Sequence, residues 1–196
     1  MKIVFATSNQ HKLKELNEIA KTFGISDVEF ILPPEDFNPV EDGATFEENS
    51  FIKAREAARL TGMMALADDS GLCVECLNGA PGIYSARYAD TPQDRIDKLL
   101  AAVESFEDKR AKFVCAMTLV DKNGDILFAD RGECLGKIAE KQAGCNGFGY
   151  DPIFLVNGKN GQTMAELTDD EKNSISHRGN ALRKVLEFID LRKRNR

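Results

Sequence analysis

The chain opens with the stretch IVFATSNQHK, residues 3–12, in which four apolar residues are followed by polar ones. The apolar run at residues 3–6 predicts a short buried strand, and the polar run after it predicts the turn into a helix. Gly24 is expected to end that helix. One face of it carries regularly spaced apolar residues: Leu13, Leu16, Ile19, Ala20 and Phe23. A strand followed by a helix in this way is typical of an α/β protein.

Local signals indicate further elements along the chain. Thr45 opens a T-x-x-E capping pattern, which predicts a second helix that runs to Gly62. Thr91-Pro92 predicts the start of a third helix, with threonine as N-cap and proline at the first helical position. Asn123-Gly124 lies between two apolar runs and predicts a β-hairpin. Because parallel crossovers and an antiparallel hairpin occur in one chain, we expect an α/β fold with a mixed sheet.

Two other predicted segments show where the polar motifs lie relative to strands and helices. Residues 64–67 are expected to form a strand that ends at Asp68-Asp69-Ser70-Gly71, and residues 72–77 also have a strand pattern. The last helix is indicated by a single apolar stripe: Leu182, Val185, Leu186 and Ile189. Polar motifs recur where strands give way to loops or helices, which is where α/β proteins bind ligands.

The composition excludes several classes of function. The 196 residues include 26 Lys and Arg and 32 Asp and Glu, which gives a net charge of −6 and argues against a general nucleic-acid-coating surface. No apolar run approaches the roughly 18 residues of a membrane span. The N-terminus turns polar by Thr7, too soon for a signal peptide. We therefore expect a cytoplasmic protein with no membrane partner.

The five cysteines are an odd number, which argues against a disulfide framework and for a reducing compartment. Cys73 and Cys76 have the C-x-x-C spacing of zinc and redox motifs. A zinc site needs a second pair of ligands, however, and a redox pair is more often found at a helix start. We therefore interpret both as small, buried apolar residues.

Residues 7–12 form the first motif that suggests a binding function. A helix N-terminus favours phosphate through its free amides and its dipole, and Lys12 adds a positive charge. The glycine-rich loop of a Walker motif is absent. The alternative is that Ser8 or Asn9 only caps the helix while Lys12 is solvated.

The second motif is acidic. Glu41 and the pair Asp68-Asp69 suit Mg²⁺, which takes oxygen ligands from one or two carboxylates together with phosphate oxygens. Because side chains alternate along a strand, Asp68 and Asp69 are expected to point to opposite faces. Glu47 and Glu48, in the first turn of a helix, are better explained as capping residues.

The third motif combines the glycine loop around Phe148 with polar residues further along. Phe148 suits stacking on a base, and Asp151, His177 and Arg178 suit hydrogen bonds to its edge. Taken singly, Phe148 is more often a core residue, and His177-Arg178 more often a surface pair at a helix start. No Ser-His-Asp or Cys-His arrangement supports acyl transfer.

Five motifs, in this order, resemble the inosine triphosphate pyrophosphatase family over residues 3–189. They are Thr7-x-Asn9-x-x-Lys12, Ala67-Asp68-Asp69-Ser70-Gly71-Leu72, Gly79-x-Pro81-Gly82-x-Tyr84-Ser85-Ala86-Arg87-Tyr88, Gly147-Phe148-Gly149-Tyr150-Asp151-Pro152 and Ser176-His177-Arg178. The resemblance implies Mg²⁺-dependent hydrolysis of ITP, dITP and XTP to the nucleoside monophosphate and pyrophosphate. It also implies a homodimer and a two-lobed mixed sheet with flanking helices and a central nucleotide-binding cleft. Residues 1–191 would form this single domain, and residues 192–196 a basic tail.

The resemblance also assigns roles to individual residues. Asp69 would be the catalytic base and, with Glu41, a metal ligand; some members carry a glutamate where this chain has Val40. Substrate contacts are implied for Thr7, Ser8, Asn9, Gln10, His11, Lys12, Lys53, Ser70, Phe148, Gly149, Tyr150, Asp151, Lys172, His177 and Arg178.

Arg178 is a hydrogen-bond donor without acceptor capacity, so it suits the 6-oxo group of hypoxanthine and xanthine and opposes the amino group of adenine. On this basis Arg178→Ala narrows the preference for ITP over ATP. Three alternatives remain at this point: a pyrophosphatase of related fold for modified pyrimidine triphosphates or dTTP, a nucleotide-binding regulator without turnover, and an RNA-binding module that uses the basic run at residues 192–196.

Overall fold

The computed structural model describes residues 1–25 and 27–194, apart from the side chain of His11. The chain divides into two compact units. The first comprises Met1–Asp69, Cys115–Gly132 and Arg178–Arg196, and the second comprises Ser70–Val114 and Glu133–His177. Each unit is built from segments that are distant in the sequence.

Six strands form a sheet in the order β2-β1-β3-β4-β5-β6. Their bounds are β1 Lys2–Phe5, β2 Glu29–Ile31, β3 Ala65–Val74, β4 Arg110–Val120, β5 Ile126–Ile138 and β6 Phe154–Val156. Strand β1 is parallel to both β2 and β3, whereas β5 and β6 are antiparallel. The α/β fold with a mixed sheet that the sequence predicts is therefore confirmed.

The α-helices begin and end close to where their caps predict. They are α1 Gln10–Thr22, α2 Phe46–Thr61, α3 Pro92–Val103, α4 Asp169–Ile175 and α5 His177–Arg194. Thr45 and Thr91 are the N-caps of α2 and α3, and each hydroxyl accepts a backbone hydrogen bond from the first turn. Gly62 ends α2 in the left-handed conformation, with φ 65°.

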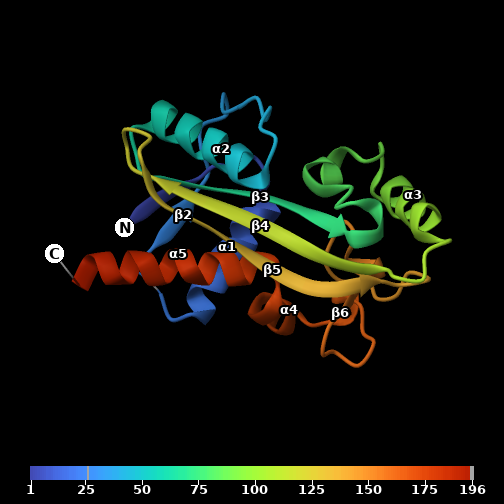
Figure 1. Cartoon of the computed structure of the whole chain (residues 1–196). Coiled ribbons are helices and arrows are strands. Elements are labelled where there is room, and N and C mark those ends of the chain that lie inside the picture. The colour runs from blue at the N-terminus through green and yellow to red at the C-terminus, as the bar shows by residue number, and fades with distance from the viewer. Residues whose placement is uncertain (26, 195–196) are drawn as a thin grey trace. The chain divides into compact units, whose positions relative to one another are not determined.

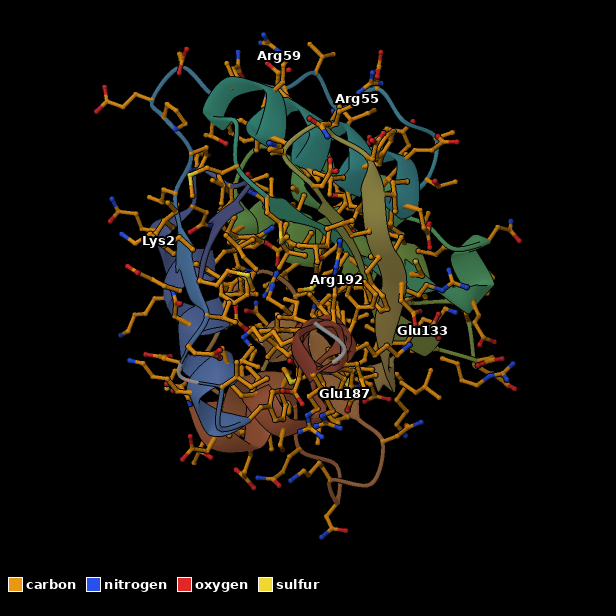
Figure 2. All side chains as sticks on the ribbon, turned by 90° about the vertical axis from the view of Figure 1, so that its left-hand side faces the viewer. Lys2, Arg55, Arg59, Glu133, Glu187 and Arg192 are labelled. Carbon is orange, nitrogen blue, oxygen red and sulfur yellow. The ribbon has the colours of Figure 1, made fainter. Side chains whose placement is uncertain are left out.

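Helices cover both faces of the sheet in the first unit, with α2 on one side and α1 and α5 on the other (Figure 1). Side-chain alternation in β1 explains this arrangement, since Ile3 and Phe5 pack with α1 and α5 while Val4 packs with the alanines of α2. The opposite face of α2 is exposed and carries Arg55 and Arg59 (Figure 2).

The second unit has a core of its own, in which α3 packs on the parts of β3, β4 and β5 that belong to this unit. Its buried residues include Leu72, Ile96, Leu99, Phe113 and Phe154. Short 3₁₀ helices make up much of the remaining structure: η1 Glu75–Leu77, η2 Gly82–Arg87, η3 Asp151–Ile153 and η4 Met164–Glu166.

Three segments of the secondary structure differ from what the sequence patterns predict for them. Strand β3 is continuous over Ala65–Val74, so Asp68-Asp69-Ser70-Gly71 lies inside a strand and does not end one. Cys76 lies in η1, after the strand, and both Cys73 and Cys76 are half-buried. Helix α5 continues through Arg194, so residues 192–194 belong to its last turn, whereas residues 195–196 lie outside the described residues. None of the described helices is long and apolar enough to cross a membrane.

Candidate functional site

Two neighbouring carboxylates on β3 organise the charged residues of the first unit. Asp68 is fully buried, and both of its carboxylate oxygens lie 3.2 Å from Lys12 Nζ. Asp69 has different partners, since its Oδ1 accepts from Lys53 Nζ at 3.3 Å and its Oδ2 from Asn49 Nδ2 at 3.1 Å. The separate partners are consistent with the expected alternation of the two side chains.

Lys53 on α2 lies between two carboxylates. Its ammonium is 2.7 Å from Glu41 Oε2 and 3.3 Å from Asp69 Oδ1. Burial acts to lower the pKa of Lys53, but the charges of Asp68, Asp69 and Glu41 outweigh it and raise that pKa. Lys53 therefore remains a cation in the site at neutral pH.

Asp69 is less easily ionised than an ordinary aspartate. Burial raises its pKa above the usual 3.8, and the neighbouring Glu41 and Asp68 act in the same direction. Lys53 and the hydrogen bond from Asn49 act in the opposite direction but do not cancel the shift. A raised pKa favours proton acceptance, which suits a general base.

Arg178, in the first turn of α5, is a buried cation held by two acids. Its Nη1 donates to Glu15 Oε2 at 2.7 Å, and its Nη2 lies 3.2 Å from Asp68 Oδ2. Burial acts to lower the pKa of Arg178, but Glu15 and Asp68 more than compensate and raise it. The prediction that Arg178, taken singly, is a surface residue at a helix start is therefore wrong, since its side chain is only 2% exposed.

The segment of residues 7–12 forms the N-terminus of α1. The side chain of Asn9 accepts from Lys12 N at 3.3 Å, and Thr7 Oγ1 accepts from Asn9 N at 3.1 Å. Asn9 therefore caps the helix, as one of the two interpretations predicts, whereas Lys12 is not simply solvated because it pairs with Asp68. Ser8 and Gln10 are exposed, and the side chain of His11 lies outside the described residues.

The second unit contains a separate polar cluster around Asp151. Its Oδ2 accepts from Lys172 Nζ at 2.8 Å and from Phe148 N at 2.9 Å. The Lys172 ammonium also lies 4.8 Å from the centre of the Phe148 ring. Phe148 is 53% exposed, so it is not a core residue and its ring is available for stacking.

Glycine is required beside this cluster for a steric reason. A Cβ on Gly147 would lie 2.1 Å from Asp151 Oδ2 and 3.0 Å from Lys172 Nζ, and the residue has φ +76°. Gly149 also has a positive φ, of 62°, but its Cβ position is open. The glycine loop therefore brings the backbone directly against the Asp151–Lys172 pair.

His177 and Tyr150 are buried in the second unit. The His177 ring stacks on Phe113 with a centroid distance of 4.8 Å, so it is not the surface residue typical of a helix start. Tyr150 donates its hydroxyl to Ser85 O at 3.0 Å, and burial raises the pKa of Tyr150 to about 12. Ser70, on β3, is half-buried.

A divalent cation fits the donor set of the first unit when substrate supplies part of its coordination. Among residues 1–25 and 27–194, no three His, Cys, Asp or Glu side chains are grouped as a metal site. Glu41 and Asp69 nevertheless converge on the single ammonium of Lys53. Mg²⁺ is commonly held by one or two carboxylates together with phosphate oxygens, and this pair matches that pattern.

Sequence reasoning missed two residues of these clusters, Asn49 and Glu15. Asn49 is 1% exposed on the buried face of α2, and Glu15 pairs with Arg178. A polar residue on the apolar face of a predicted helix is the signal that identifies Asn49, because such a residue needs a buried partner. Glu15 lies among the polar residues of α1, and no pattern in the sequence distinguishes it.

Comparison with known proteins agrees with the motifs. A "dITP/XTP pyrophosphatase" of Staphylococcus epidermidis is 45% identical over 191 residues, which cover 96% of each chain. A protein of the same name from Desulforamulus reducens is 46% identical and covers 97% of this chain and 96% of its own. The solved Ham1 protein of Staphylococcus aureus is 40% identical, with a TM-score of 0.86 over 97% of this chain and 98% of that one.

The model of the Ham1 family matches residues 3–188, nearly the whole chain. This match and the full-length relatives confirm the resemblance that the five motifs carry in the sequence. The chain belongs to the Ham1 family.

Proposed function

We propose that the protein hydrolyses the non-standard purine nucleoside triphosphates ITP, dITP and XTP to the nucleoside monophosphate and pyrophosphate. The observation that carries the proposal is that Lys53 and Asn49 each hold one oxygen of Asp69, a half-buried carboxylate with a raised pKa beside the cations that a polyphosphate needs. The names of the full-length relatives supply the substrate class. Removal of these nucleotides keeps their bases out of DNA and RNA.

Charge neutralisation of the triphosphate is the first requirement of this reaction. Lys12 and Lys53 supply positive charge in the first unit, and the N-terminus of α1 adds the positive end of the helix dipole. We include Mg²⁺ in the proposal, held by Glu41 and Asp69 together with the phosphates. When bound, it would neutralise phosphate charge and lower the pKa of a coordinated water.

Asp69 then acts as the general base. It takes a proton from the attacking water, the water oxygen bonds to the α-phosphorus, and the bond from that phosphorus to the bridging oxygen breaks. Pyrophosphate leaves with the electron pair of that bond. Lys53 stabilises the ionised form of Asp69 and orients its carboxylate through the contact at 3.3 Å.

The second unit provides the groups for base recognition. The half-exposed ring of Phe148 suits stacking on a purine, and stacking of this kind contributes about 1–3 kcal/mol. Lys172 and Asp151 hold that ring and its backbone in place. His177 would contribute a hydrogen bond to the nucleotide.

The remaining parts of the proposal are a homodimer and a cytoplasmic location, without nucleic-acid or membrane partners. The family resemblance supports the dimer, and the net charge of −6 supports the absence of nucleic-acid binding. Light scattering on a size-exclusion column measures the dimer directly, at twice the 21.7 kDa of the chain.

The proposed reaction is tested by its products. With ITP and Mg²⁺, the protein is expected to release IMP and pyrophosphate in equal amounts, with no IDP or inorganic phosphate. Release of IDP and phosphate would contradict attack at the α-phosphorus. EDTA is expected to stop the reaction, and excess Mg²⁺ to restore it.

A further inference from the structure

Asn49 is a buried side chain that uses both ends of its amide. Its Nδ2 donates to Asp69 Oδ2 at 3.1 Å, and its Oδ1 accepts from Gly43 N at 2.9 Å. These partners fix the orientation of the amide, because an ionised carboxylate can only accept and a backbone N–H can only donate. The side chain is 1% exposed, so neither bond is readily replaced by water.

Asn49 and Lys53 are four residues apart on the same face of α2, and they hold different oxygens of the Asp69 carboxylate. Asn49 donates to Oδ2 and Lys53 to Oδ1. Rotation of the carboxylate would break or weaken at least one of these contacts. Lys53 also binds Glu41, so any movement of Glu41 would shift the Lys53 ammonium. Lys53 therefore cannot fix the orientation of Asp69 without a second contact.

The other end of Asn49 fixes the loop that carries Glu41. Gly43 lies two residues after Glu41, and a Cβ on Gly43 would lie 2.7 Å from Asn49 Oδ1 and 2.8 Å from Glu48 Cβ. The next residue, Ala44, donates its N–H to Glu48 Oε2 at 2.6 Å. The loop therefore packs directly against the first turn of α2, with Asn49 as its contact with β3.

We propose that Asn49 is a positioning residue that sets the relative placement of the Glu41 and Asp69 carboxylates, a role that rests on the proposed hydrolysis at Asp69. It touches neither substrate nor metal in this role. If Asn49 only stabilised the start of α2, it would need the hydrogen bond to Gly43 but not the one to Asp69. The two bonds can be separated by substitution.

Asn49→Asp is the variant that separates them. Its carboxylate retains an acceptor for Gly43 N–H but presents an oxygen to Asp69 where the amide presents a donor. We expect kcat for ITP to fall about 100-fold, since a displacement of about 1 Å in an active site has an effect of that size. Asn49→Ala, which loses both bonds, is expected to lower kcat to a similar extent, while KM changes less than threefold.

Asn17→Ala is the matched control. Asn17 also bridges two elements of the first unit through both ends of its amide, since it donates to Leu13 O and Phe30 O and accepts from Phe30 N. It is expected to lower the Tm about as much as Asn49→Ala and to leave kcat within twofold of wild type. If Asn49→Ala and Asn49→Asp also keep kcat within threefold of wild type, the positioning role is overturned.

Crystal structures of wild type and Asn49→Asp provide a readout that does not depend on turnover. We expect the distance between the Glu41 and Asp69 carboxylates to differ between them. An unchanged distance overturns the proposal even if activity is lost. If wild type itself does not hydrolyse ITP, the proposed function fails, and the distance alone still decides whether Asn49 positions the two carboxylates.

Discussion

Arg178 and Asp68 are 110 residues apart in the chain, yet they form a fully buried ion pair in which Arg178 Nη2 lies 3.2 Å from Asp68 Oδ2. The same carboxylate binds Lys12, and the same guanidinium binds Glu15. The pair therefore links the N-terminal end of α1 with the start of α5. It also joins three segments of the first unit that the sequence separates.

Loss of one partner of this pair should be costly. Arg178→Ala leaves the buried carboxylate of Asp68 and the half-buried carboxylate of Glu15 without their arginine, and a broken buried pair typically loses about 3–5 kcal/mol. We expect a loss of this size in the free energy of unfolding, measured with urea. Arg110→Ala, at an exposed pair with Asp108, should leave that free energy within experimental error.

The same variant tests whether Arg178 reads the base. If it does, the ITP-to-ATP ratio of kcat/KM narrows in Arg178→Ala under conditions where the variant is folded. An unchanged ratio together with lower stability would limit Arg178 to its contacts with Glu15 and Asp68. The geometry of those contacts leads us to expect the larger effect on stability.

Asp69→Asn removes the proposed base but keeps the size of the side chain. We expect kcat to fall about 10²–10⁴-fold, because that is the usual contribution of a positioned general base. The variant should remain folded with a lower Tm than wild type, because its amide oxygen replaces only one of the two acceptors that Lys53 and Asn49 use, while Glu41 still pairs with Lys53. A variant with more than a tenth of wild-type kcat would show that Asp69 is not the base.

The two glycines of the loop around Phe148 should respond differently to alanine. Gly147→Ala places a methyl group 2.1 Å from Asp151 Oδ2, so it should displace the Asp151–Lys172 pair and raise KM for ITP at least tenfold. Gly149→Ala meets no atom within 4 Å and should cost only the backbone strain of a positive φ, about 1–2 kcal/mol. Equal KM values in the two variants would argue against a substrate role for this cluster.

The raised pKa of Tyr150 predicts that the protein loses stability at high pH. Its pKa is raised from 10.0 to about 12, chiefly by burial, so the folded protein holds this proton more tightly than the unfolded chain. Its contribution to stability is therefore complete below pH 10 and is lost as the pH rises through about 12. In Tyr150→Phe, urea unfolding between pH 9 and 12 should show a weaker decline than wild type, whereas the exposed Tyr84→Phe should follow wild type. A decline in Tyr150→Phe as steep as that of wild type would contradict the assignment.

Much of the secondary structure could be predicted because its signals are local. The caps at Thr45 and Thr91 and the turn at Asn123-Gly124 each depend on a few neighbouring residues, and the structure has all three. The continuity of β3 was missed because Asp68-Asp69-Ser70-Gly71 is polar, and its partners come from α1, α2 and α5. Helix α4 was also missed, although Thr168 and Glu171 form a capping box that signals it.

The sequence proposes the residue types of the candidate site but contains no signal for their pairings. The motifs suggested Lys12 and Arg178, and the family resemblance suggested Lys53, as cations near phosphate or base; the structure adds the acids that they contact. Those acids are distant in sequence and are selected by the packing of helices on the sheet. No local pattern contains that information.

The central claim is the substrate class, and the most direct test is pyrophosphate release from ITP, XTP, GTP, ATP and dTTP, each with Mg²⁺ and with EDTA. We predict rapid Mg²⁺-dependent release from ITP and XTP, with GTP, ATP and dTTP at least 100-fold lower in kcat/KM. Preference for dTTP, equal release from all five, or no release from ITP and XTP would contradict the account.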